Sequence, residues 1–258
     1  MAIIRNEALH KQVAAAMRQS IATGEWPPGT QLPTETDLAE TYGVSRPTVR
    51  LAVAALRSEG QLDVKQGRGT FVRAAVHGPS ASLERTIATQ GDTFSTPFDA
   101  WFDHAEEPTV YRTRTDAITA PLLEMDQDEL MLGCDRLLAN PIGAGRALHR
   151  LLLPMERIEA TPLAQQPAAT PTEAYTALAT AGHNLTWHER VSARVPQPDE
   201  REALQLSEAA VLLIAHRITC DQATGLPLIL EETRLGAETT ALTYAIDAHK
   251  PKRAKASR

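Results

Sequence analysis

The sequence predicts an α+β protein made of two parts. The N-terminal part is a winged helix-turn-helix, and the C-terminal part is an antiparallel α+β domain. Residues 30–73 have the pattern of helix, turn, helix and a short hairpin with a glycine-rich tip. Residues 97–248 alternate between strand patterns and a few helices, which favours consecutive hairpins rather than a parallel sheet. The net charge also differs in sign between these two parts.

The first helix is expected over residues 7–23. Apolar residues recur there every four positions and form one stripe, consisting of Leu9, Val13, Met17 and Ile21. Gly24 and the Pro-Pro-Gly run at 27–29 end this helix.

The second helix begins at Thr34, which forms a capping box with Asp37. Its apolar positions Leu38 and Tyr42 point inward, and Gly43 ends it in a tight turn.

Ser45 caps the third helix, and Pro47 lies in its first turn, where a missing amide costs little. At 100° per residue, three arginines fall within about 40° of one another, while an apolar set lies roughly 100° away. The arginines are Arg46, Arg50 and Arg57, and the apolar set is Val49, Ala52 and Leu56. One face therefore packs and the other stays basic. A solvated surface face is the alternative, but the caps, the spacing and the following hairpin all favour a DNA-recognition helix.

A hairpin follows, with residues 62–65 and 70–73 as its strands and Gln66-Gly67-Arg68-Gly69 as its tip. Two glycines allow positive φ and a close approach to a ligand, so Arg68 is placed to enter a DNA groove, the minor groove in particular. An ordinary hairpin turn is the alternative for this tip taken alone.

The stretch LPTETDLAETYGVSRPTVRLAVAALRSEGQL and the wing QGRGTFV resemble the winged helix-turn-helix of GntR-type bacterial transcriptional regulators over about residues 5–73. The resemblance implies that Arg46 and Arg50 read guanines or hold phosphates. It implies that Thr34, Ser45 and Thr48 contact phosphates, and that Gln66, Gly67 and Arg68 form the wing tip. Some members of the family have an arginine where this chain has Thr36, so that contact is not carried over.

Composition limits the remaining possibilities. No apolar run approaches the ~18 residues that span a bilayer, the N-terminus lacks signal-peptide features, and only Cys134 and Cys220 occur. A reduced cytoplasmic protein without a membrane partner is expected. Residues 1–73 hold nine basic and seven acidic residues, for a net charge of +2, whereas residues 74–248 hold twelve and twenty-five, for −13. DNA would repel the acidic part and attract the basic end.

The second part is expected to consist of a linker over residues 74–96, a domain over 97–248 and a basic tail over 249–258. The linker contains one short helix, residues 82–90. A further helix is expected over 170–181 with Thr172 as its cap, and a short one over 199–206. Strands are expected at 110–118, 130–138, 147–153, 185–195, 211–220, 226–234 and 240–247.

RLLANPIGAGRALHRLLLP and LQLSEAAVLLIAHRITCDQATGLPLILEETRL, in this order, resemble the UTRA effector-binding domain of HutC-type GntR regulators, which implies a chorismate-lyase-like fold. The family often has an arginine pair on the strand before the first hairpin. Arg136 matches one arginine, and Leu138 stands at the place of the other. Ile229 stands where an acidic residue is common, which argues against assuming an amino-sugar phosphate ligand. The candidate ligand-binding residues are Arg136, His149, Arg150, Glu231, Glu232 and Tyr244.

Strand alternation places His149 and Arg150 on opposite faces, and likewise Glu231 and Glu232, so only one of each pair lines a given pocket. Structural ion pairs are the alternative role for these side chains. His183, His188 and Glu189 lack the i, i+4 helical spacing of a metal pair. No metal, cofactor or catalytic residue is expected.

The sequence therefore predicts a ligand-responsive transcriptional regulator, most simply a repressor. It would bind a double-stranded inverted-repeat operator as a homodimer and be released by a small molecule. Two alternatives stay open, an enzyme fused to a DNA-binding head and a DNA-binding dimer without an effector.

Overall fold

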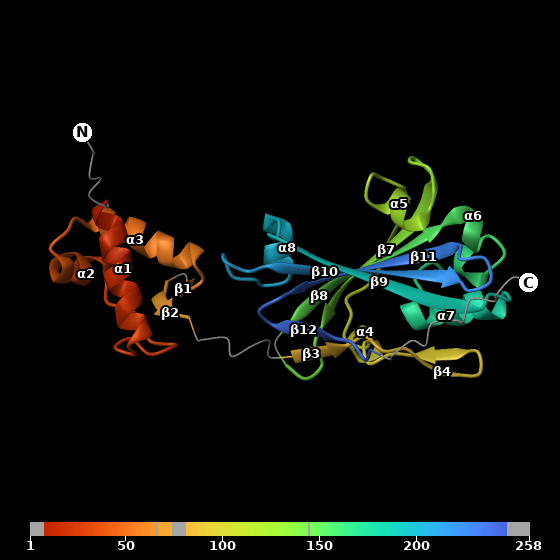
Figure 1. Ribbon diagram of the computed structural model, residues 1–258, viewed down its shortest axis with the longest axis horizontal. Coiled ribbons are helices and arrows are strands. Elements are labelled where there is room, and N and C mark those ends of the chain that lie inside the picture. The colour runs from red at the N-terminus through yellow and green to blue at the C-terminus, as the bar shows by residue number, and fades with distance from the viewer. Residues whose placement is uncertain (1–7, 66, 74–80, 144, 247–258) are drawn as a thin grey trace, which may run out of the picture. The chain divides into compact units, whose positions relative to one another are not determined.

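A computed structural model describes residues 8–65, 67–73, 81–143 and 145–246 (Figure 1). The chain divides into two compact units, which are considered one at a time. Of the described residues, the first unit takes 8–73, 193–213 and 236–238, and the second takes those within 81–192, 214–235 and 239–246. The fold class is the expected one, a helix-turn-helix with a hairpin and a mixed domain built on an antiparallel sheet.

Three N-terminal helices share one apolar core. They are α1 (Leu9–Ala22), α2 (Glu35–Tyr42) and α3 (Arg46–Ser58). Their inward residues include Val13, Met17, Leu38, Val49, Ala52 and Leu56. Leu9 was expected in the apolar stripe but is 60% exposed, because it is the first residue of α1 and lies outside the core cluster.

The predicted caps of α2 and α3 are confirmed. The Thr34 hydroxyl accepts from the Asp37 amide at 3.2 Å, and the Asp37 carboxylate accepts from the Thr34 amide at 3.1 Å. Gly43 ends α2 with φ of 62° in the left-handed region. The Ser45 hydroxyl accepts from the Thr48 amide at 3.4 Å and begins α3. These local contacts fix the angle at which α3 leaves the turn.

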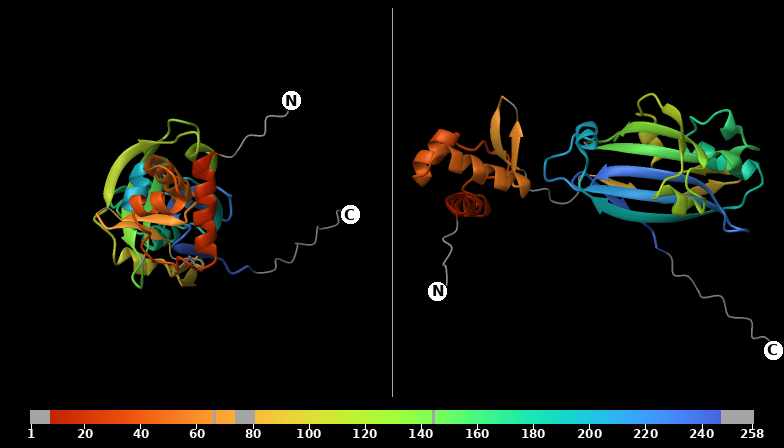
Figure 2. Two further views of the ribbon diagram at one scale, coloured as in Figure 1. Left: turned by 90° about the vertical axis from the view of Figure 1, so that its left-hand side faces the viewer. Right: turned by 90° about the horizontal axis from the view of Figure 1, so that it is seen from above.

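The predicted hairpin is also confirmed. β1 (Leu62–Lys65) and β2 (Gly69–Val72) pair antiparallel, and they project from the three helices as a separate arm (Figure 2). Gln31 supports the tip, because its side-chain amide donates to the Arg68 carbonyl at 2.9 Å. A Cβ at Gly69 would lie only 2.6 Å from that amide nitrogen, and φ there is +110°, so this position needs glycine.

The second unit is built on a six-stranded sheet in the order β6-β7-β8-β11-β10-β9. The strands are β6 (Thr109–Arg114), β7 (Leu130–Ala139), β8 (Arg146–Pro154), β9 (Leu185–Arg194), β10 (Leu212–Asp221) and β11 (Pro227–Gly236). The pairs β6–β7, β7–β8 and β8–β11 are antiparallel. The β8–β11 contact joins segments about eighty residues apart, so the hairpins do not simply follow one another through the sheet.

Helices cover both faces of this sheet (Figure 1). On one face, α7 (Pro171–Thr180) packs Tyr175 and Leu178 against Cys134 and Leu151, and we call this the α7 face. On the other, α5 (Thr119–Leu123) packs Leu123 against the strands. Smaller elements of this unit are α4 (Asp99–Phe102), α6 (Met155–Ile158) and a 3-10 turn η1 (Pro162–Ala164), whereas α8 (Pro198–Ala203) belongs to the first unit.

The helix expected over residues 82–90 is wrong. The chain there forms β3 (Ala81–Glu84) and β4 (Ala88–Gln90). β3 pairs in parallel with β12 (Thr240–Thr243), and β4 pairs with β5 (Thr93–Ser95) across a turn at Gly91 with positive φ. β3 forms with a strand from the other end of the chain, so its own sequence carried little sign of it. The tail, 249–258, lies outside the described residues, as does the part of the expected linker before Ala81, residues 74–80.

Two further boundaries differ from expectation. α7 is capped by Thr170 rather than Thr172, because Pro171 occupies the first helical position and Glu173 completes a capping box with Thr170. The strands expected to reach residues 118 and 247 end earlier, at Arg114 and Thr243.

Candidate functional site

α3 presents two arginines to solvent at its N-terminal end. Arg46 is its first residue and Arg50 follows one turn later, with side chains 60% and 66% exposed. The hydroxyls of Ser45 and Thr48 lie 2.9 Å apart at the same helix end, and Thr34 begins the neighbouring α2. Guanidinium and hydroxyl groups on one exposed helix end are the groups that contact DNA bases and phosphates.

Both arginines converge on one carboxylate, that of Glu35 at the start of α2. Arg50 donates through Nε to Oε1 at 3.2 Å and through Nη2 to Oε2 at 2.8 Å. Arg46 Nη2 lies 3.9 Å from the same Oε2. The hydrogen bond from Arg50 holds the pKa of Glu35 below its ordinary value. The sequence reasoning did not single out Glu35, although its place directly after the cap Thr34 was visible.

The tip of the hairpin adds a third cation. Gly67 and Arg68 are exposed there, and Lys65 lies 5.0 Å from the centre of the Phe71 ring. Gln66, expected at the wing tip, lies outside the described residues. The arm therefore offers Arg68 to solvent on a backbone that Gln31 supports from below.

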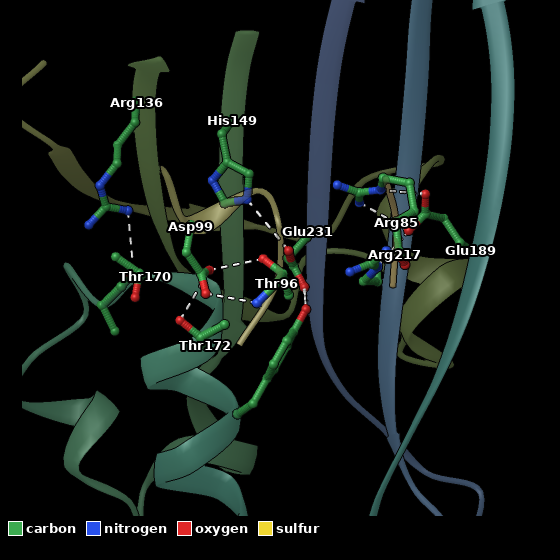
Figure 3. Close-up of polar contacts among 12 residues, drawn as sticks. Arg85, Thr96, Asp99, Arg136, His149, Thr170, Thr172, Glu189, Arg217 and Glu231 are labelled. Atoms are coloured by element: carbon green, nitrogen blue, oxygen red, sulfur yellow. Dashed lines mark hydrogen bonds and ion pairs between the residues drawn. The ribbon is translucent and has the colours of Figure 1, made fainter. Parts of the chain in front are cut away.

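On the α7 face, the second unit brings three of the predicted ligand residues together on adjacent strands (Figure 3). Arg136 on β7 is directly opposite His149 on β8, and Glu231 on β11 is opposite Leu151, two residues further along β8. Arg136 is 6% exposed, His149 1% and Glu231 2%. The three side chains point to the same face because residues opposite each other on neighbouring strands do so, and because every second residue along a strand shares a face.

His149 is enclosed by aromatic rings. Phe98 and Phe102 approach it edge-on, with centroids 6.0 and 5.0 Å away. Within the described residues, neither ring nitrogen has a hydrogen-bond partner, and Nε2 is 3.6 Å from Glu231 Oε2. That distance is too long for a hydrogen bond. Burial lowers the pKa of His149, so the imidazole is neutral and has unused hydrogen-bonding capacity in a closed environment.

Glu231 is held by α7. The Tyr175 hydroxyl donates to its Oε1, and both side chains are buried. Burial raises the pKa of Glu231, but the nearby Arg217 guanidinium and the hydrogen bond from Tyr175 outweigh that effect and keep it below its ordinary value. Burial also raises the pKa of Tyr175 well above its usual range, so the phenol keeps its proton and donates.

A second set of ion pairs lies on the α7 face. Glu189 on β9 accepts from Arg85 Nε at 2.9 Å and from Arg217 Nε at 2.5 Å, and both arginines are buried. Tyr244, a predicted ligand residue, donates to Glu189 at 2.6 Å and is 39% exposed. The structure therefore places Tyr244 beside the Glu189 pairs rather than beside Arg136 and His149.

The other two predicted ligand residues lie on the opposite face of the sheet. Arg150 donates to Asp135 at 2.8 and 2.7 Å, and His216 Nε2 is 2.8 Å from Glu232. Burial raises the pKa of Asp135, but Arg150 outweighs this and keeps it below its ordinary value. Arg150 and Glu232 therefore point away from His149 and Glu231, as strand alternation predicted, and do not line the same pocket.

Polar side chains that the sequence reasoning missed border the α7 face near Arg136. Asp99 accepts from the Thr96 amide at 2.8 Å and from the Thr172 hydroxyl at 3.4 Å (Figure 3). Arg136 donates to the Ala168 and Ala169 carbonyls just before α7. Asp99 follows Thr96 by three residues, the spacing that also marked Thr34 and Asp37, whereas no local pattern marks Tyr175. Arg217, however, is a charge inside the apolar run of β10, and that was a readable signal.

Two clefts open beside α7. One, of about 410 Å³, is lined by Ala168 and Ala169, whose carbonyls accept from Arg136. The other, of about 430 Å³, is lined mainly by apolar atoms and includes Phe94 and Thr172. The first cleft therefore brings solvent close to the carbonyls that accept from Arg136.

Other chemistry finds little support. In the described part of the chain, no group of three His, Cys, Asp or Glu side chains is arranged to hold a metal ion. His183 instead pairs with Asp221 at 3.0 Å. Among the same residues, no helix is long and apolar enough to cross a membrane.

The fold and the exposed arginines define a class of protein, a winged helix-turn-helix DNA-binding protein with an attached mixed domain. Residues 9–72 match the family model described as bacterial regulatory proteins, gntR family. An uncharacterized HTH-type transcriptional regulator, RB1450 of Rhizobium meliloti (strain 1021), is 28% identical over 91% of this chain and 93% of its own length. The N-terminal part therefore matches the helix-turn-helix domain of gntR-family regulators, and most of the chain is similar to an HTH-type transcriptional regulator.

Two further similarities are informative. The mannosyl-D-glycerate transport/metabolism system repressor MngR of Escherichia coli (strain K12) is 44% identical over 26% of this chain and 28% of its own length. A solved structure described as a putative GntR-family transcriptional regulator aligns with a TM-score of 0.63 at 20% identity. It covers 94% of this chain and 99% of that one, so it supports the fold of both parts.

Proposed function

We propose that this protein is a ligand-responsive bacterial transcriptional repressor that binds an inverted-repeat operator as a homodimer and leaves it when a small molecule binds. The DNA-binding part of this proposal rests on Arg46 and Arg50. Both are exposed at the N-terminal end of a recognition helix, beside a wing that carries Arg68. One such helix reads one half-site, so a palindromic operator requires two-fold symmetry.

The proposed domains are a DNA-binding domain over residues 1–73, a linker over 74–96, an effector-binding and dimerisation domain over 97–248 and a basic tail. We assign the second domain to the UTRA type of HutC-like regulators. Its sequence resemblance supports this, as does the similarity of most of the chain to an HTH-type transcriptional regulator. A bacterial DNA-binding regulator acts in the cytoplasm, where the chromosome is.

The proposed effector site is the buried cluster of Arg136, His149 and Glu231 on the α7 face. Among the described residues, the contacts of the Arg136 guanidinium are neutral carbonyls and the Phe102 ring, 5.7 Å from its centre. A buried cation without a carboxylate partner is costly, and a ligand anion would remove that cost. The unused nitrogens of His149 add a donor and an acceptor. We therefore propose a small ligand with an anionic group at Arg136.

Repression and release follow from a shift between two domain arrangements. The effector must bind one arrangement more tightly than the other, and operator DNA must favour the opposite one. MngR, which resembles the N-terminal part of this chain, is named as a repressor, and this supports the proposed sign of regulation.

The test begins with selection of binding sites from random DNA duplexes by the full-length protein, followed by affinity measurements on the enriched sequence. Arg46→Ala and Arg50→Ala should each cost about 1–3 kcal/mol of binding free energy. Arg18→Ala is the matched control, since Arg18 is also an exposed arginine paired with a glutamate, Glu59, but lies on α1. Unchanged binding in both α3 variants would refute the proposed recognition face.

The proposed release by a small molecule is tested with metabolite extracts. The extracts are separated on an anion exchanger, and each fraction is added to the protein–operator complex. We expect a retained fraction to release the DNA, and Arg136→Ala to abolish that response while operator affinity stays the same. Arg150→Ala is the control on the opposite face of the sheet. If every fraction leaves the complex intact, the protein is better described as a DNA-binding dimer without an effector.

A further inference from the structure

The ion pairs of Glu35 place an acidic side chain among the groups assigned to DNA. Glu35 is the first residue of α2, and its side chain is 35% exposed on the same surface as Arg46 and Arg50. DNA presents a dense row of negative phosphates, so a carboxylate here weakens sequence-independent attraction. A surface built only for affinity would place a neutral or basic residue at this position.

The geometry of the Arg50–Glu35 pair suggests what the carboxylate contributes. Two parallel hydrogen bonds, Nε to Oε1 and Nη2 to Oε2, occupy one edge of the guanidinium. This arrangement fixes the plane of the group, which a single contact would not do. The Nη1 amino group and the outer hydrogen of Nη2 then point away from Glu35 and form a second donor edge.

That second edge has the spacing that a guanine requires. Guanine O6 and N7 accept two parallel hydrogen bonds from an arginine in the major groove, and this contact discriminates strongly between bases. A flexible arginine can also turn aside and bind a phosphate, which carries no sequence information. Because Glu35 holds the Nε–Nη2 edge of Arg50, binding of a guanine is favoured over binding of a phosphate.

We infer that Glu35 is a positioning residue for sequence discrimination. It orients Arg50, and more weakly Arg46 at 3.9 Å, toward base edges, and its negative charge penalises binding to DNA that offers only phosphates. This inference rests on the proposed operator binding through α3. It assigns a role to a residue that touches no DNA itself but acts through the arginine beside it.

The experiment compares binding of the full-length protein to the enriched duplex and to a scrambled duplex of equal length, at two salt concentrations. Glu35→Gln should tighten binding to scrambled DNA and lower the preference for the enriched duplex by roughly 5- to 150-fold, the discrimination of one bidentate guanine contact. Glu40→Gln is the matched control, because it removes the same charge from an exposed position of α2. It should leave the preference unchanged.

A double-mutant cycle shows whether Glu35 acts through Arg50. In the Arg50→Ala background, Glu35→Gln should cause a much smaller loss of preference, limited to the part that acts through Arg46 and through the charge of Glu35. Arg50→Lys keeps the charge but lacks the planar fork, so it should lose preference as Glu35→Gln does. Thermal melting of each variant checks that the fold is intact, and Arg50→Lys reports on the same contact if Glu35→Gln fails to fold.

Three outcomes are separable. If Glu35→Gln behaves as Glu40→Gln does, or if it lowers the preference equally with and without Arg50, the role of Glu35 is refuted. If Arg50→Ala leaves the preference unchanged, this inference fails, and the proposed recognition face fails with it only when Arg46→Ala is also without effect. If Arg50→Ala loses the preference and Glu35→Gln does not, only the inference fails.

Discussion

Replacing His149 should change how the stability of the second unit depends on pH. His149 is 1% exposed, packed between Phe98 and Phe102, and its pKa is lowered by burial. In the unfolded chain the imidazole has a pKa of about 6.5 and takes up a proton below that value. The folded state excludes this proton, so stability is complete above pH 6.5 and is lost as the pH falls toward the folded pKa.

The size of the effect follows from this linkage. Protonation of the unfolded imidazole between about pH 7.5 and about pH 5.5 stabilises the unfolded chain by at most about 1.4 kcal/mol, and any proton that the folded imidazole takes up reduces this figure. For a domain of this size, that corresponds to a fall in melting temperature of roughly 3–6 °C. The pKa of Glu231 is also lowered, but that carboxylate loses its contribution only below its unfolded pKa of about 4.3, outside this window.

The assay is calorimetric melting of wild type and His149→Gln at both pH values. Glutamine carries no titrating proton. The variant should therefore lack the part of the fall in melting temperature that His149 causes when the pH is lowered, whatever its absolute stability. The opposite sign would refute the reasoning. If folded His149 were protonated and paired with Glu231, its pKa would be raised, and wild type would gain stability relative to the variant as the pH fell.

Two further substitutions test how each unit is held together. Thr34→Ala should destabilise α2 by about 0.5–2 kcal/mol through loss of its cap, seen as faster hydrogen exchange of α2 amides, whereas the exposed neighbour Thr36→Ala should have little effect. Tyr175→Phe should cost about 1.5–3 kcal/mol in thermal melting, because buried Glu231 loses a charge-assisted donor. An unchanged melting temperature would mean that water replaces the phenol.

The N-terminal unit could be predicted from the sequence because its determinants are local. Thr34 and Asp37 are three residues apart, as are Ser45 and Thr48, and Gly43 ends its helix with its own backbone. The apolar spacing of α3 then decides which arginines remain outside. The role of Glu35 was missed because its determinant is not local: its partner Arg50 is fifteen residues away on another helix.

The second unit could be predicted only strand by strand. Alternation showed that His149 and Arg150 point to opposite faces of the sheet. It could not show which residues of different strands point to the same face. That information is in the register, which pairs Arg136 with His149 across a hairpin and Glu231 with Leu151 across about eighty residues. Tyr175 and Glu189 reach the same face from α7 and β9, and no short-range pattern carries that arrangement.

The buried cluster on the α7 face bears on the choice between an effector-binding domain and a domain that only dimerises. Arg85, Arg217, Glu189 and Glu231 are charged groups largely removed from water, and well-packed apolar residues would usually be at least as stabilising there. Dimerisation alone does not require charged groups buried inside the domain. A ligand site uses them, because these pairs hold Tyr175 and Glu231 beside His149 and Arg136. Within the part of the chain that the structure describes, the His149 ring nitrogens have no hydrogen-bond partner and the Arg136 contacts include no carboxylate. We therefore favour the effector-binding alternative on energetic grounds.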